Sequence, residues 1–290
     1  MIANYMAQVG NHADGALDEN LFRHMVLNTI RANKVKFGIT FGELVIACDG
    51  KKLWRRELFP HYKANRKKAR EESDLDWSII FDTLSEIRED LKQHFPYKVI
   101  HVDRCEADDV IATYAVKEPG PVRIVTGDRD LFQLVSDDPD VQVIYLAKGI
   151  SNHDLVNRAW IAKKYQIPGD RYGLFATFRG DPSDGLPGVK GIGEKGAALI
   201  ANHYASAEEA ITGAKNADNH LSASLQKKII EGAEYLSFAP KLVACATDVP
   251  LPKIDIKLPK KPESLDKIIG YKEKYNLGSS VDRLISALNW

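Results

Sequence analysis

Eight carboxylate side chains fall in four short clusters of the sequence, and their type and spacing suit the binding of divalent metal ions. The clusters are Asp49; Glu106, Asp108 and Asp109; Asp128 and Asp130; and Asp181 and Asp184. Two carboxylates about 4 Å apart repel by roughly 4 kcal/mol at an effective dielectric near 20, so several in one cleft need cations. Mg²⁺ prefers carboxylate oxygens, supplemented by water and substrate phosphate. The clusters therefore predict metal-dependent chemistry on phosphodiesters.

The order of apolar and amphipathic segments predicts an α/β fold. Short apolar runs rich in β formers predict strands at 43–48, 97–102, 122–126 and 141–146. Helical periodicity lies between them, which favours a mostly parallel central sheet flanked by helices. Ligands of such sheets bind beyond the carboxyl ends of the strands, and Asp49 and Asp128 fall at such ends.

We expect two regions. Residues 1–150 should form an α/β core that includes a basic helical arch at 51–74. Residues 151–290 should form a helical region with a helix–hairpin–helix at 184–204. Further helices are expected at 154–165, 171–179, 206–214, 221–236 and 279–288, and the proline-containing stretch 249–263 should be an extended connector.

Composition excludes several classes of protein. The 290 residues carry 40 basic and 40 acidic side chains, with no apolar run long enough to cross a membrane and no secretory signal. Three cysteines are too few and too scattered for a disulfide framework or a zinc site. We expect a reduced, cytoplasmic protein that is a monomer.

Each acidic cluster also has an ordinary structural explanation. Carboxylates at a helix start act as caps, which could account for one or two acids of EADD (106–109). The acids of GDRD (127–130) and GDPSDG (180–185) could be turn residues. Their occurrence together favours the metal site, with Asp109 the weakest candidate ligand.

A basic arm at 51–70 contains nine Lys or Arg residues and one acid, Glu57, with Trp54, Phe59 and Tyr62 interleaved. This pattern suits stacking on unpaired bases together with phosphate neutralisation. Lys63 and Arg66 would share a helix face and could reach a scissile phosphate. The expected contacts to DNA in this arm are Arg55, Arg56, Tyr62 and Lys67.

A second nucleic-acid contact is expected in GVKGIGEKGA (188–197). Gly191 and Gly193 permit a tight turn, and the next helix opens around Lys195. Backbone N–H groups, the helix N-terminus and the side chains of Lys190 and Lys195 could together hold phosphate without reading sequence. The alternative is an ordinary helix hairpin with glycine turns.

These motifs, in this order, resemble the 5′-nuclease (flap endonuclease and 5′→3′ exonuclease) superfamily over about residues 20–240. Residues 54–73 look most like the ribonuclease H of T-even-type bacteriophages, and residues 182–195 look more like the exonuclease domain of bacterial DNA polymerase I. The resemblance implies a PIN-like fold and hydrolysis of DNA or RNA/DNA hybrid at 5′ ends or flaps, using two Mg²⁺ or Mn²⁺ ions. It further implies RNA primer and flap removal during DNA replication, possible replication partners and a K⁺ ion at the hairpin.

The resemblance also assigns individual residues. The first metal site corresponds to Asp49, Glu106, Asp108 and Asp128, and the second to Asp130, Asp181 and Asp184, with Asp109 between them. Lys63 and Arg66 correspond to catalytic arch residues at the scissile phosphate. Gly191, Gly193 and Lys195 correspond to the duplex-binding hairpin.

One departure from the family pattern concerns the N-terminus. The family opens with a strand whose final Asp is a first-site ligand, whereas MIANYMAQVGNH resembles the helix that follows it. We therefore expect the first strand to be truncated, either because translation begins upstream or because the protein lacks it. The alternative functions are a catalytically impaired, structure-specific DNA-binding protein and a PIN-type ribonuclease.

Overall fold

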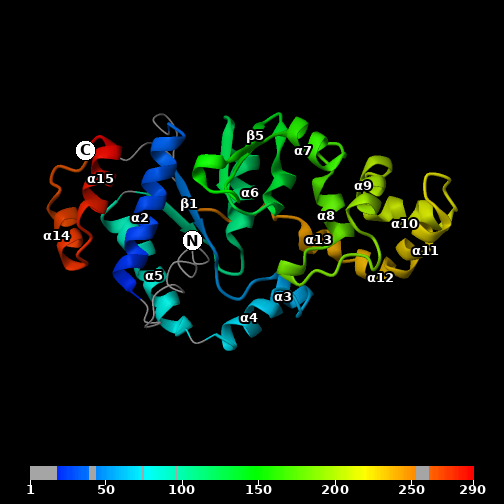
Figure 1. Cartoon of the computed structure of the whole chain (residues 1–290), viewed down its shortest axis with the longest axis horizontal. Coiled ribbons are helices and arrows are strands. Elements are labelled where there is room, and N and C mark those ends of the chain that lie inside the picture. The colour runs from blue at the N-terminus through cyan, green and yellow to red at the C-terminus, as the bar shows by residue number, and fades with distance from the viewer. Residues whose placement is uncertain (1–17, 39–43, 74, 96, 253–260) are drawn as a thin grey trace. The chain divides into compact units, whose positions relative to one another are not determined.

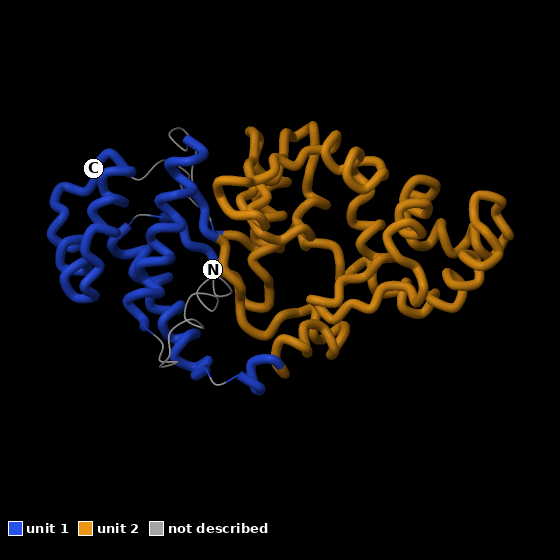
Figure 2. Tube along the Cα trace, viewed as in Figure 1, with its two compact units in different colours: residues 1–46, 69–100, 252–290 blue, residues 47–68, 101–251 orange. Residues whose placement is uncertain are grey.

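The computed structural model describes residues 18–38, 44–73, 75–95, 97–252 and 261–290. The chain divides into two compact units (Figure 2). Unit 1 comprises residues 1–46, 69–100 and 252–290, and unit 2 comprises residues 47–68 and 101–251. The N-terminal segment that resembles the first family helix, and residues 253–260 of the expected connector, lie outside the described residues. The expected boundary near residue 151 stays a prediction.

Unit 1 consists mainly of helices α2 (Glu19–Lys36), α5 (Trp77–Gln93), α14 (Asp266–Lys274) and α15 (Ser279–Leu288). Helix α2 begins where the Asp18 side chain accepts a hydrogen bond from the Leu21 backbone N–H at 2.9 Å, as an N-cap does. Helices α2 and α15 lie side by side (Figure 1), joined by a 2.6 Å hydrogen bond between His24 Nδ1 and Ser280 Oγ.

Strands β1 (Val45–Cys48) and β2 (Lys98–His101) begin in unit 1, end in unit 2 and pair with each other. In unit 2, β3 (Val122–Thr126) pairs in parallel with β5 (Asp140–Tyr145), in the register Val122 to Val141. Strands β4 (Ser136–Asp137) and β6 (Asp154–Val156) add to β5 in the antiparallel sense. The predicted α/β class is confirmed, with the difference that the described sheet is small and mixed.

Helix α6 (Ala107–Lys117) and the 3₁₀ helix η1 (Asp130–Leu134) pack on this sheet through a buried core. Phe132 of η1 is fully buried among aromatic rings, with its centroid 4.9 Å from Tyr145 and 5.3 Å from Tyr172. Because η1 follows directly after the Asp128–Asp130 cluster, this core fixes the backbone that carries those acids.

The remainder of unit 2 is helical (Figure 1). Its helices are α7 (Arg158–Tyr165), α8 (Tyr172–Arg179), α9 (Glu194–His203), α10 (Ala207–Lys215), α11 (Ala223–Glu231), α12 (Ala233–Leu236) and α13 (Ala239–Val243). The helix expected at 154–165 begins instead as strand β6 and becomes helical only at Arg158. The helix expected at 221–236 is divided at Gly232, where a Cβ would lie 2.8 Å from Val189.

The basic arm contains two short helices, α3 (Arg55–Leu58) and α4 (Ala64–Glu71). No residue of α4 is buried, as expected of a strongly charged helix. The arm is anchored by Tyr62, which packs with Leu186 and Leu242 in a small apolar cluster of unit 2. Among the described residues, no helix is both long and apolar enough to span a bilayer.

Phe132→Ala should lower the free energy of unfolding by about 3–5 kcal/mol, because it removes a buried ring from a close-packed cluster. Chemical denaturation measures this loss. Leu155→Ala on β6 is the control, since Leu155 is 49% exposed and should cost less than about 1 kcal/mol. Equal losses in the two variants would contradict the assignment of Phe132 to the core.

Candidate metal and nucleic-acid site

Three of the four acidic clusters lie where strands end or helices begin. Asp49 follows β1, and its Oδ1 accepts a hydrogen bond from the Ala107 N–H at 2.9 Å, at the start of α6. Glu106 is the N-cap of α6. Asp128 follows β3, and its Oδ1 accepts from the Asp130 N–H at 2.9 Å. The ends of β1 and β3 and the start of α6 therefore supply carboxylates to one region of unit 2.

The electrostatics of two aspartates indicate how closely the carboxylates gather. Burial and the neighbouring charges of Asp128, Glu106 and Asp49 raise the pKa of Asp108 to about 8, although Lys63 opposes them. For Asp130, burial together with the charges of Asp128, Asp181 and Asp184 raises the pKa to about 7. A carboxylate whose pKa is raised by other carboxylates lies in a region that favours added positive charge.

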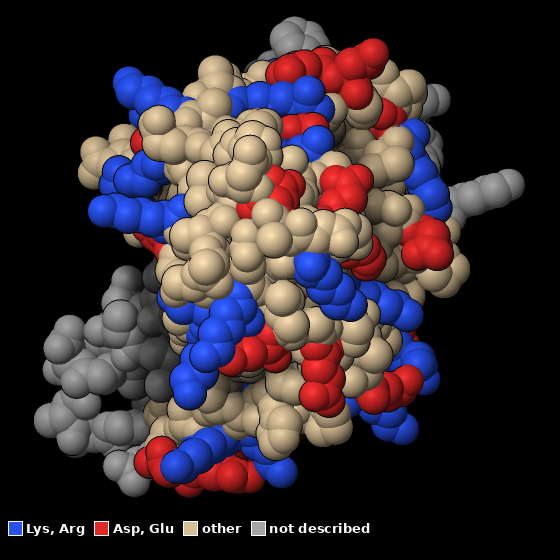
Figure 3. All heavy atoms as spheres, turned by 90° about the vertical axis from the view of Figure 1, so that its right-hand side faces the viewer, with Lys and Arg blue, Asp and Glu red and all other residues tan. Residues whose placement is uncertain are grey.

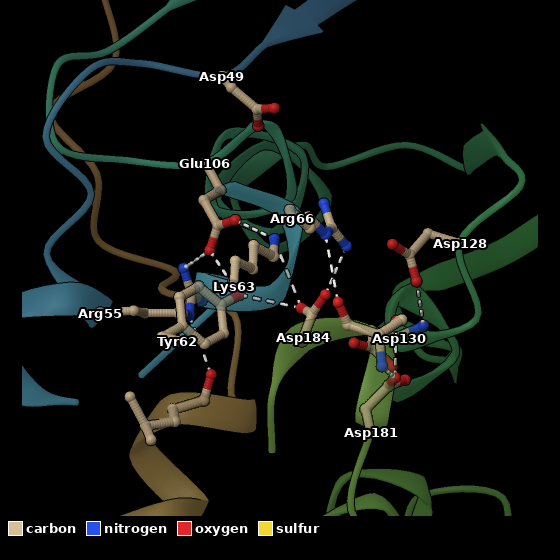
Figure 4. Close-up of polar contacts among 12 residues, drawn as sticks. Asp49, Arg55, Tyr62, Lys63, Arg66, Glu106, Asp128, Asp130, Asp181 and Asp184 are labelled. Carbon is tan, nitrogen blue, oxygen red and sulfur yellow. Dashed lines mark hydrogen bonds and ion pairs between the residues drawn. The ribbon is translucent and has the colours of Figure 1, made fainter. Parts of the chain in front are cut away.

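Basic side chains enter this acidic region, as Figure 4 shows. Lys63 Nζ contacts Glu106 Oε1 and lies 3.4 Å from Asp184 Oδ2, and Arg66 Nη2 contacts Asp184 Oδ1. Burial lowers the pKa of Lys63, but Glu106 and Asp184 outweigh it, so this pKa lies above its usual value. Arg129 Nη2 lies 3.3 Å from Asp181 Oδ2. The two predicted catalytic cations therefore contact predicted metal ligands.

The arm is attached to the loop that carries Asp181 and Asp184. The Lys63 backbone N–H donates to the Asp184 carbonyl at 2.8 Å, and Asn65 Nδ2 donates to the Pro182 carbonyl at 2.9 Å. Lys63 adopts a left-handed backbone conformation, with φ of 54°, to make this contact. The role of Asn65 was not predicted, and its only sequence signal is its place between Lys63 and Arg66.

Asp109 is fully buried, and both of its oxygens accept hydrogen bonds from donors in the interior of unit 2. Oδ1 accepts from Arg55 Nη2 at 2.7 Å and from the Ala246 N–H at 2.8 Å. Oδ2 accepts from Arg55 Nη1 at 2.8 Å, Trp54 Nε1 at 3.1 Å and the Glu106 N–H at 3.1 Å. These donors hold the pKa of Asp109 below its usual value despite burial. We therefore reassign Asp109 from metal ligand to structural anchor.

Two predicted DNA contacts in the arm point into the protein. Arg55 is 3% exposed and pairs with Glu106 and Asp109. Tyr62 is 4% exposed, and its hydroxyl lies 2.8 Å from Glu106 Oε2 and 3.1 Å from Asp184 Oδ2. Neither side chain presents a surface to an unpaired base or a phosphate, so we reassign both to structural roles. Arg56 and Lys67 are exposed, as a DNA contact requires.

The hairpin between α8 and α9 has the expected exposed turn. Lys190, Gly191, Gly193 and Lys195 are exposed, and Gly191 has a φ of +78°. The Gly191 carbonyl accepts a hydrogen bond from Lys228 Nζ of α11 at 3.0 Å. Lys228 was not predicted, because it lies 37 residues away in the sequence.

Figure 3 shows Lys and Arg side chains interspersed with Asp and Glu over the end of the molecule that carries α9 to α11. This face therefore carries no continuous basic surface. Binding of a polyanion there would depend on the local geometry of the hairpin.

The carboxylate oxygens have the chemistry that Mg²⁺ or Mn²⁺ requires. Among the described residues, however, no three carboxylate, imidazole or thiolate groups converge closely enough to hold an ion. The contacts of Glu106 and Asp184 with Lys63 and Arg66 give the physical reason, because these oxygens face basic side chains. The donor set thus fits divalent metal, provided that these side chains reorient.

Two family models match the chain. The 5′-3′ exonuclease N-terminal resolvase-like domain matches residues 13–166, and the 5′-3′ exonuclease C-terminal SAM fold matches residues 167–266. A 5′-3′ exonuclease of Streptomyces coelicolor is 39% identical over 252 residues, covering 85% of this chain and 84% of that protein. The thermostable DNA polymerase I of Thermus thermophilus is 33% identical over 229 residues, which are 78% of this chain and 25% of the polymerase.

Solved structures share the fold at low sequence identity. A T5 5′-exonuclease with bound zinc ions has a TM-score of 0.63 and 17% identity, covering 98% of this chain and 97% of that one. The catalytic core of Rad2 in complex with DNA substrate has a TM-score of 0.59 and 16% identity, covering 99% and 88%.

Gly185→Ala should lower the free energy of unfolding by about 1–2 kcal/mol, because Gly185 has a φ of +72°. An added Cβ would also lie 2.8 Å from the His61 carbonyl oxygen and push the arm away from the loop. We expect faster proteolysis within α4, measured beside chemical denaturation. Gly120→Ala is the control, since its Cβ would meet nothing within 4 Å. If the arm of Gly185→Ala resists proteolysis as well as that of the wild type, the result would argue against this attachment.

Proposed function

Because the chain belongs to the 5′-3′ exonuclease family, we propose that it is a metal-dependent 5′-nuclease. It hydrolyses phosphodiesters at 5′ ends or flap junctions of DNA and RNA/DNA hybrids. The observation that carries this proposal is the gathering of partly buried carboxylates, where burial and the neighbouring negative charges together raise the pKa values of Asp108 and Asp130.

The proposed metal ligands form two groups. The first is Asp49, Glu106, Asp108 and Asp128, and the second is Asp130, Asp181 and Asp184. Besides burial, the charges of Asp49, Glu106 and Asp128 raise the pKa of Asp108. Besides burial, the charges of Asp181 and Asp184, and also that of Asp128, raise the pKa of Asp130. Bound Mg²⁺ or Mn²⁺ would make a water molecule more acidic and neutralise the charge that develops on the phosphate.

Lys63 and Arg66 act as the phosphate-binding cations of this proposal. Lys63 lies beside Glu106 of the first group and Asp184 of the second, Arg66 lies beside Asp184, and both belong to an arm attached to the Asp184 loop. A substrate phosphate can take the place of the carboxylate that now pairs with each cation. Each cation then keeps an anionic partner, so little buried charge is left without one. Arg66 retains 46% exposure of its side chain and is the more accessible of the two.

The hairpin motif at 188–197 binds duplex phosphates through backbone N–H groups and through Lys190 and Lys195. Support comes from the exposure of both lysines and from the N-terminus of α9 directly after the turn. The K⁺ ion implied at this hairpin stays a prediction, because the Gly191 carbonyl already accepts a hydrogen bond from the Lys228 ammonium. Duplex binding compared in KCl and NaCl would test it.

The proposed biological role is RNA primer and flap removal during DNA replication, by a cytoplasmic, phage-encoded monomer that works with replication proteins. It is consistent with the similarity to a DNA polymerase I. The alternative is a structure-specific DNA-binding protein with impaired catalysis, which the pairing of Glu106 and Asp184 with basic side chains favours. Junction binding without cleavage in Mg²⁺ would support the alternative.

Asp128→Asn should reduce cleavage of a 5′-labelled flap duplex by about a hundredfold or more, since it removes a charge common to both carboxylate groups. Junction affinity measured in EDTA should stay unchanged. Asp82→Asn, an exposed change in α5, is the matched control and should cleave normally. Undiminished turnover by Asp128→Asn would remove this residue from the site.

Lys195→Ala should weaken duplex binding and reduce the salt dependence of the binding constant by about one charge. Fluorescence anisotropy over a range of salt concentrations measures both effects. Lys163→Ala replaces an exposed lysine of α7, outside the hairpin, and should leave the slope unaltered. A wild-type slope in Lys195→Ala would show that this lysine contacts no phosphate.

A further inference from the structure

The Arg55 guanidinium uses all of its hydrogen-bonding capacity inside unit 2. Arginine has five N–H donors in a planar fork. Nε donates to the Leu242 carbonyl at 2.9 Å, and Nη1 donates to Glu106 Oε2 and Asp109 Oδ2, each at 2.8 Å. Nη2 donates to Asp109 Oδ1 at 2.7 Å and to the Ala244 carbonyl at 2.8 Å. The five donors thus have five partners, so none remains for nucleic acid.

This arrangement divides the two oxygens of Glu106 between different partners. Oε2 accepts from Arg55 and from the Tyr62 hydroxyl, both at 2.8 Å, and both of those side chains are buried. Oε1 contacts Lys63, whose side chain retains 11% exposure. Figure 4 shows Glu106 with Arg55 on one side and Lys63 on the other. One oxygen is therefore held by the interior, and the other faces the candidate site.

Asp109 holds Arg55 in turn. It is fully buried, forms a two-pronged ion pair with the guanidinium and also accepts from the Ala246 N–H. The backbone carbonyls of Leu242 and Ala244, which belong to the same segment as Ala246, accept the remaining hydrogen bonds from Arg55. A buried ion pair of this kind tolerates little movement, because breaking it leaves a charge without a partner.

We propose that Arg55 is a positioning residue for Glu106. Its hydrogen bond to Oε2 leaves a single oxygen of Glu106, Oε1, to face a divalent ion. The inference rests on the proposed function, since it assigns Glu106 to the metal site. It replaces the expected DNA contact of Arg55 with a role in metal affinity.

The test is Mn²⁺ binding to the full chain without nucleic acid, measured by the electron paramagnetic resonance signal of free Mn²⁺. Arg55→Lys keeps the charge but cannot reproduce five donors in a plane. It should weaken Mn²⁺ binding by about 10–100-fold, as loss of a group that orients a ligand does. The control is Arg123→Lys, at an exposed arginine paired with Asp140, which should bind Mn²⁺ like the wild type.

A double-mutant cycle separates positioning from general destabilisation. Arg55→Lys in a Glu106→Gln background should add no further loss of Mn²⁺ affinity, because the ligand that Arg55 orients is already impaired. Independent, additive losses would overturn the proposal, as would wild-type Mn²⁺ affinity in folded Arg55→Lys.

Two outcomes outside this cycle are also decisive. If Arg55→Lys does not fold, Asp109→Asn should weaken Mn²⁺ binding instead, and unchanged affinity there overturns the proposal. If the wild type binds no Mn²⁺, the proposed function fails together with this inference. If the wild type binds Mn²⁺ and cleaves flap DNA, and Arg55→Lys binds Mn²⁺ equally well, only the inference about Arg55 fails.

Discussion

Carboxylates held close together in a partly buried place need positive charge, and this constraint shapes the centre of unit 2. Burial and mutual repulsion raise the pKa values of Asp108 and Asp130 to about 8 and about 7. Basic side chains of the arm pair with Glu106 and Asp184, and Arg129, directly before η1, pairs with Asp181. The position of the arm, the attachment of the acidic loop and the proposed demand for metal all follow from this charge balance.

The basic side chains at this centre are of two kinds. Arg55 has every donor satisfied and is caged by backbone carbonyls, so it behaves as a fixed part of the interior. Lys63 and Arg66 have fewer contacts and more exposure, with 11% and 46% of their side chains accessible. The difference matters for function, because a cation that is to bind substrate must be able to exchange its partner, whereas one that orients a ligand must not.

The helical half of unit 2 supplies a separate element for binding. Its hairpin is exposed at the turn and anchored beneath it by buried Val189 and Ile192. Lys228 adds a contact to the Gly191 carbonyl from a helix far along the chain. Because acidic and basic side chains are mixed over this end of the molecule (Figure 3), affinity for a duplex would come from oriented backbone groups and a few lysines.

The sequence alone determined the class of fold, the acidic clusters and the family, because strand ends, turn residues and motif order are local properties of the chain. It predicted the segments of β3 and β5 as strands of a mostly parallel sheet, and the turn at Gly191. It could not determine which acids and bases pair. Asp109 and Arg55 are of the same residue types as their functional neighbours in the sequence. Only their burial, the carbonyls of Leu242 and Ala244 and the N–H of Ala246 assign them to the interior. Tertiary structure decided their roles, because hydrogen-bond saturation depends on partners that are distant in sequence.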